Sequence, residues 1–72
     1  MDTQPKLLDV IALLNAIPEK HVVRGQVGTI VENLKNGVYE VEFADKQGKA
    51  IVTLALRKDD FLVLHHEMEE VA

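Results

Sequence analysis

An Asn-Gly pair at positions 36 and 37 constrains this chain more than any other feature, because it separates two strand-like runs. Both residues tolerate a positive φ, and a two-residue turn of this kind joins antiparallel strands in a tight hairpin. Residues 27–34 (VGTIVENL) before the turn are rich in β-branched side chains, and residues 38–43 (VYEVEF) after it alternate in polarity. The sequence therefore predicts a β-hairpin across the Asn-Gly turn.

Two more segments continue this pattern towards the C-terminus. Residues 51–57 (IVTLALR) alternate again and predict a fourth strand, and residues 61–64 (FLVL) predict a short closing strand. Residues 57–60 (RKDD) between them predict a single helical turn, with Asp59 and Asp60 placed to accept hydrogen bonds from its free N–H groups. The C-terminal half therefore predicts strands with close connections.

Residues 7–14 (LLDVIALL) fit two patterns. The apolar residues recur at helical spacing, but the run is short and is followed by Asn15 and Pro18. A strand here would also complete a sheet with the segments that follow. The strand is the favoured interpretation, and the helix stays open as the alternative.

The connection at residues 15–26 predicts a long loop. Pro18 disfavours helical geometry at the residue before it, and Gly25 is suited to a turn with a positive φ. Gly28, inside the strand-like run that follows, predicts a bulge or a close approach of the backbone.

Together these segments predict an all-β fold, a small five-stranded SH3-like barrel with one short helical turn before the last strand. We expect a polar lead at residues 1–6, the barrel domain at residues 7–64 and an acidic tail at residues 65–72. A closed barrel would leave no sheet edge open to pairing.

Composition narrows the classes of function. With 72 residues, the chain is expected to form one domain with a small core. Its net charge of −4, from 12 acidic and 8 basic residues, argues against nucleic acid as the main partner. No apolar signal core or membrane-length run is visible, so we expect no membrane association and a cytoplasmic location.

The sequence carries no recognisable catalytic set. Cys and Ser are absent, and a small filled barrel offers no cavity in which carboxylates could work as acid–base pairs. His65-His66-Glu67 is better interpreted as part of a solvated tail than as a metal site, because adjacent residues of an extended chain point to opposite sides. We therefore expect no enzyme, no cofactor, no metal and no small-molecule substrate.

Apolar residues also occur on the strand faces that are expected to point away from the core, and this feature is the more informative one about function. The alternation in residues 7–14 is interpreted with Leu8, Val10, Ala12 and Leu14 towards the core, which leaves Ile11 and Leu13 on the opposite face. Ile30 likewise lies on the other face of its strand from Val27 and Val31. The candidate partner-binding residues, taken from this face and the long loop, are Ile11, Leu13, Val22, Val23, Arg24 and Ile30.

One alternative for this surface stays open. The loop, with Ile17, Val22 and Val23, would bury the same apolar face if it folded across it. In that arrangement the apolar surplus would belong to the core.

Three stretches carry a resemblance to a known family: LLDVIALL, IPEKHVVRGQVGTIVE and GVYEVEFADKQGKAIVTLAL, followed by the LRKDDFLVL close. Together, over about residues 7–64, they resemble a family of small bacterial proteins, frequent in cyanobacteria, catalogued as domain of unknown function 4926. The resemblance implies an SH3-like barrel and no established activity. The neighbouring genes typical of the family suggest a toxin–antitoxin or immunity setting.

The leading hypothesis is a non-enzymatic protein-interaction module that binds a protein partner or its own copy, in an antitoxin, immunity or accessory-subunit role. An accessory subunit would use the acidic strand face around Glu40 and Glu42. The alternative is a nucleic-acid-binding small barrel. Its candidate contacts are Lys20, His21, Arg24, Lys35 and Lys49.

Overall fold

The structure is a computed structural model that describes residues 4–44 and 51–64. The elements in chain order are β1 (Val10–Leu13), the 3-10 turn η1 (Pro18–Lys20), β2 (Val27–Lys35), β3 (Val38–Ala44), β4 (Ile51–Arg57), the 3-10 turn η2 (Lys58–Asp60) and β5 (Phe61–Val63). All strand pairs are antiparallel and belong to one sheet with the order β4-β3-β2-β1-β5. The all-β class, the five strands and the helical turn before the last strand are therefore confirmed.

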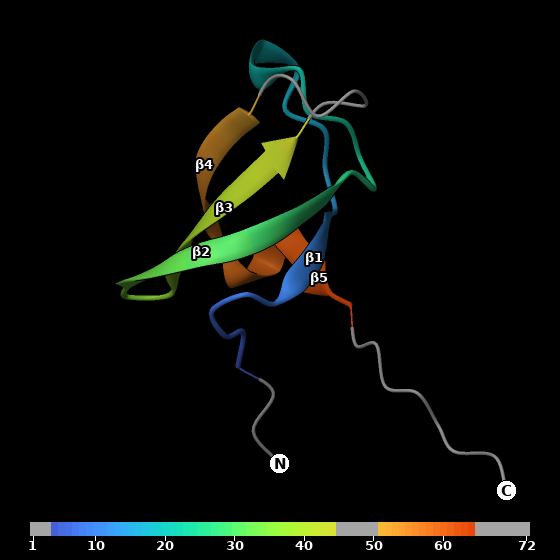
Figure 1. The fold of residues 1–72 in the computed structure, drawn as a ribbon. Coiled ribbons are helices and arrows are strands. Elements are labelled where there is room, and N and C mark those ends of the chain that lie inside the picture. Colours follow the sequence, from blue (N-terminus) through green and yellow to red (C-terminus); the bar gives the residue numbers. More distant parts are fainter. Residues whose placement is uncertain (1–3, 45–50, 65–72) are drawn as a thin grey trace, which may run out of the picture.

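The sheet curls, with the long β2 crossing between the β3–β4 side and the β1–β5 side (Figure 1). In the part of the chain that the structure describes, β4 and β5 are the two ends of the sheet and do not pair with each other. Backbone hydrogen bonds between the described residues therefore do not close the sheet into the expected barrel, and the sheet keeps two edges. Side chains bridge these ends instead, because Leu56 of β4 and Phe61 of β5 belong to one buried cluster.

The Asn-Gly hairpin forms as predicted. Lys35 pairs with Val38, and the two residues between them take positive φ values of 57° at Asn36 and 78° at Gly37. Asn33 adds a side-chain contact, since its Oδ1 accepts a hydrogen bond of 2.8 Å from the Lys35 backbone N–H. The hairpin end of β2 is thus fixed by local chemistry.

The ambiguous segment at residues 7–14 contains the strand β1, which resolves the choice against the helix. β1 lies between β2 and β5, with Ala12 opposite both Val27 and Leu62. Ahead of it, the Leu8 N–H donates to the Ile30 carbonyl at 2.8 Å. Pro5, within the predicted polar lead, is buried.

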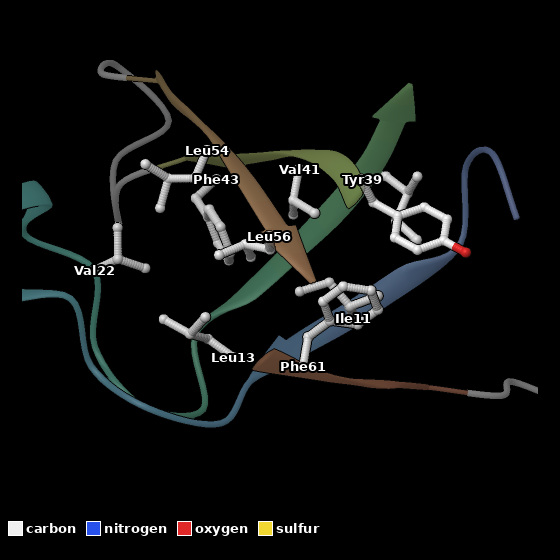
Figure 2. Close-up of a cluster of buried hydrophobic side chains, with 10 residues drawn as sticks. Ile11, Leu13, Val22, Tyr39, Val41, Phe43, Leu54, Leu56 and Phe61 are labelled. Atoms are coloured by element: carbon white, nitrogen blue, oxygen red, sulfur yellow. The ribbon is translucent and has the colours of Figure 1, made fainter. Parts of the chain in front are cut away.

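The core lies on the inner face of the curled sheet, where Tyr39, Val41 and Phe43 of β3 face the other strands as predicted (Figure 2). Tyr39 also contacts Phe61 edge-to-face, with ring centroids 5.9 Å apart, which links β3 to β5. The core cluster of buried residues in the described part of the chain consists of Ile11, Leu13, Val22, Ile30, Tyr39, Val41, Phe43, Leu54, Leu56 and Phe61.

The predicted face of β1 is wrong, and so is that of β2. Ile11 and Leu13 point inward, whereas Leu8 and Leu14 are exposed. On β2, Ile30 is fully buried, while Val27 is 53% exposed. The physical reason lies in the register: Ile30 pairs with the core residue Val41, and residues directly opposite in a sheet share a face.

Candidate functional site

The long loop between β1 and β2 is tied back to the sheet by hydrogen bonds at its closing end. The Gly25 N–H donates to the Leu13 carbonyl at 2.6 Å, and the Leu13 N–H donates to the Gln26 carbonyl at 2.9 Å. The Gln26 N–H also closes a turn onto the Val23 carbonyl at 3.0 Å, inside which Gly25 takes a φ of 84°. This positive φ is the reason for glycine at position 25, as the sequence predicted.

The Gln26 side chain joins this loop to the far end of β3. Its Oε1 accepts a hydrogen bond of 3.0 Å from the Val23 N–H, and its Nε2 donates to the Ala44 carbonyl at 3.3 Å. One amide therefore uses both its acceptor and a donor to hold two segments in register. Sequence analysis missed this residue, because a single glutamine at the end of a loop carries no distinguishing pattern.

A surface hollow of about 530 Å³ lies at this junction. We call it the loop hollow; its lining residues are His21, Val23, Arg24, Gly25, Gln26, Val27 and Ala44. An adjoining hollow of about 310 Å³ shares part of this wall and reaches Lys20, Phe43 and Val52. The site is therefore a shallow, mixed surface formed by the loop, the start of β2 and the end of β3.

Cationic and apolar side chains are mixed around the loop hollow. Lys20, His21 and Arg24 are all exposed, and Val23 is 61% exposed between His21 and Arg24. His21 takes a left-handed φ of 59° at the end of η1, which turns the chain sharply at this point. The rim therefore offers positive charge next to exposed apolar surface.

Apolar surface continues from the loop hollow along the outside of the sheet. Val27 lines the hollow and pairs with Ala12, which in turn pairs with Leu62 on β5. Val27 is 53% exposed and Leu62 is 57% exposed, while Ala12 and Val10 are half-buried. We call Val10, Ala12, Val27 and Leu62 the outer apolar strip.

The candidate residues predicted from sequence divide into two groups. Ile11, Leu13, Val22 and Ile30 are 0–2% exposed and belong to the core, so a partner cannot reach them and this part of the prediction is wrong. The open alternative holds in part, because the loop residue Val22 packs into the core beside them (Figure 2).

Val23 and Arg24, the other two candidate residues, lie on the rim of the loop hollow. Of the residues proposed for nucleic-acid binding, Lys20, His21 and Arg24 come together in this region. Lys35 lies at the β2–β3 hairpin instead. Lys49 and the His65-His66-Glu67 run lie outside the described residues.

Two negative findings apply to residues 4–44 and 51–64. No group of three or more His, Asp or Glu side chains is placed to hold a metal ion within these ranges. None of the helical segments there has the length and apolar character needed to cross a membrane.

Taken together, these features define a small all-β domain of one five-stranded sheet, with a mixed cationic and apolar site beside its longest described loop. The chain belongs to the family described as Domain of unknown function (DUF4926), whose family model matches residues 7–63. This match confirms the resemblance seen in the sequence. No curated protein and no solved structure matches the chain.

Proposed function

We propose that the chain is a non-enzymatic protein-interaction module, which binds a partner protein through the loop hollow and the outer apolar strip. The observation that carries this proposal is the continuity of exposed apolar surface from Val23 through Val27 to Leu62. Apolar side chains that line up across three strands of a sheet are typical of a surface that another protein covers.

The charges around the loop hollow indicate which residues the partner would carry. Lys20 and Arg24 lie beside this apolar surface, whereas the chain as a whole carries a net charge of −4. A segment with acidic residues flanking an apolar anchor would match both features. We place this interaction in the cytoplasm, in an antitoxin or immunity pair or in a larger complex to which this chain is an accessory subunit.

The test uses one substitution in the site and one matched control. Val27→Glu puts a charge at the junction of the loop hollow and the strip, on a side chain that is already 53% exposed. Leu34→Glu makes the same change at a 42% exposed leucine near the hairpin, outside the site. Both variants are expected to fold, because neither position is in the core.

The measurement is the affinity for a partner first identified by native co-purification and then purified. We expect Val27→Glu to weaken binding by at least about tenfold, equivalent to about 1.4 kcal/mol, and Leu34→Glu to leave it unchanged. Equal affinity of Val27→Glu and the unmodified chain would refute the site. Failure of the unmodified chain to retain any protein would count against the function itself.

A second candidate function, nucleic-acid binding, is favoured by one observation. Lys20, His21 and Arg24 are brought to the same region of the surface. Phosphate contacts made by such residues weaken steeply as salt is raised, which separates this function from an apolar protein contact.

A further inference from the structure

β4 forms one end of the sheet and has a partner on one side only (Figure 1). It is seven residues long, and each residue pairs with β3 without a register shift. Its exposed side chains alternate with inward-facing ones; they are Ile51, Thr53, Ala55 and Arg57. The edge of β4 that faces away from β3 therefore presents an uninterrupted row of backbone groups.

The hydrogen bonds identify which backbone groups point away from β3. The Arg57 N–H donates to Asp60 Oδ2 at 2.8 Å, so it is not directed at its pairing partner Val38. Val38 closes the hairpin with Lys35, so its own groups point to β2. Antiparallel strands alternate hydrogen-bonded and non-bonded pairs. Arg57 is in a non-bonded pair, so every second residue before it also directs its N–H and C=O away from β3. These residues are Ile51, Thr53 and Ala55.

Within residues 4–44 and 51–64, none of the devices that usually protect the end of a sheet is found at this edge. Such devices include proline, lysine, a bulge or a covering segment. β4 contains none of the first three, and its one charge, Arg57, lies at its last position. In the described part of the chain, the hydrogen bonds of β4 run to β3 or, for Arg57, to Asp60.

We propose that β4 pairs antiparallel with β4 of a second copy, so that one sheet runs through a two-fold dimer. Two copies of β4 can pair because each directs both N–H donors and C=O acceptors away from β3. The donors of one copy can then bond to the acceptors of the other. This inference does not rest on the proposed function, since the loop hollow and the outer apolar strip involve other strands.

The overlap of the two strands selects the register of this pairing. With Thr53 opposite Ala55 of the second copy, Arg57 of that copy lies opposite Ile51. In this register all seven residues of β4 pair with β4 of the second copy. With Thr53 opposite itself, Leu56 and Arg57 would have no partner within β4 of the second copy. The first register therefore forms the longer ladder of backbone hydrogen bonds, and this favours it.

The first test is the mass of the full chain in solution, by light scattering or sedimentation, over a wide range of concentration. We expect twice the chain mass at high concentration. Thr53→Pro removes an N–H that the single copy does not use, and proline is tolerated at such an edge position. It should halve the mass while circular dichroism remains that of the folded chain.

Thr53→Val is the matched control, because it keeps the N–H and the β-branched shape, and it should remain dimeric. A monomer at every concentration overturns the proposal, as does a folded Thr53→Pro chain that stays dimeric. Open-ended polymers would also overturn it, because a two-fold contact closes on itself.

A second test holds even if Thr53→Pro fails to fold. The chain has no cysteine, so Thr53→Cys and Ala55→Cys each introduce a single thiol. Residues directly opposite in a bonded pair have Cα atoms about 5.5 Å apart, within disulfide range. A mixture of the two variants should form the mixed disulfide under mild oxidation, several-fold more than either alone. Preferential cross-linking of Thr53→Cys with itself would overturn the register.

Discussion

At the scale of single residues, the absence of a side chain at Gly28 lets β2 lie close to Phe43 of β3. A Cβ at this position would lie 2.7 and 2.8 Å from two ring carbons of Phe43, and 2.9 Å from the Glu42 carbonyl oxygen. The sequence predicted a bulge or a close approach at this glycine. The close approach is confirmed, and the register shifts of β2 lie further along the strand, between Ile30 and Glu32 and between Asn33 and Lys35.

Gly28→Ala is therefore expected to destabilise the fold. The added methyl group has to displace a buried ring or a backbone carbonyl, and overpacking of this kind costs about 1–3 kcal/mol. Denaturant unfolding followed by circular dichroism measures the free energy of unfolding. Val27→Thr, a shape-conserving change at the exposed neighbour, is the control and should shift it by less than about 0.5 kcal/mol. An equally stable Gly28→Ala chain would show that the ring of Phe43 moves freely.

At the scale of elements, the strands could be predicted from alternation and turn chemistry, but the inward faces of β1 and β2 could not be taken from alternation alone. Both faces of β1 are apolar, so a period of two fits either orientation. The predicted hairpin turn contains the information needed to assign the inward face of β2. Counting back from the Lys35–Val38 pair places Ile30 on the face of Phe43, and the two register shifts in β2 preserve that result.

The outer face of this hairpin has an unfavourable pair. Glu32 lies directly opposite Glu40, and like charges in such positions destabilise a sheet. Glu32→Lys replaces the repulsion with an attraction and should raise the free energy of unfolding by about 0.2–1 kcal/mol. Thermal or denaturant unfolding at low and high salt would measure it, and the gain should shrink as salt screens the charges. A gain that persists unchanged at high salt would point to strand propensity as its cause.

At the scale of the whole molecule, the fold class was predictable and the accessible surface was not. Ile11, Leu13 and Ile30 carry the apolar character that suggested a partner surface, but the curled sheet turns them inward. The same curvature leaves Val27 and Leu62 outside. Which apolar face becomes the core depends on contacts between distant strands, and local patterns do not encode it.

The acidic balance of the whole chain leads to a prediction on nucleic acid. Lys20 and Arg24 give a small cationic region on a molecule with net charge −4, so long-range attraction to phosphate is weak. We expect any binding to single- or double-stranded oligonucleotides at low salt to disappear near physiological salt, measured by fluorescence anisotropy. Arg24→Gln should abolish the residual signal. Tight binding that survives physiological salt would favour the nucleic-acid function over the protein-interaction module.

The bridge made by Gln26 has a consequence for how this domain diversifies. One amide joins the loop to the end of β3 through the Val23 backbone, while the side chains of Val23 and Arg24 are exposed and take no part in these hydrogen bonds. Side-chain substitutions at positions 23 and 24 are therefore expected to alter the proposed interaction surface with little effect on folding. Under the proposed function, the chain would adapt to a partner whose surface changes during evolution by changing these two side chains, while its sheet stays the same.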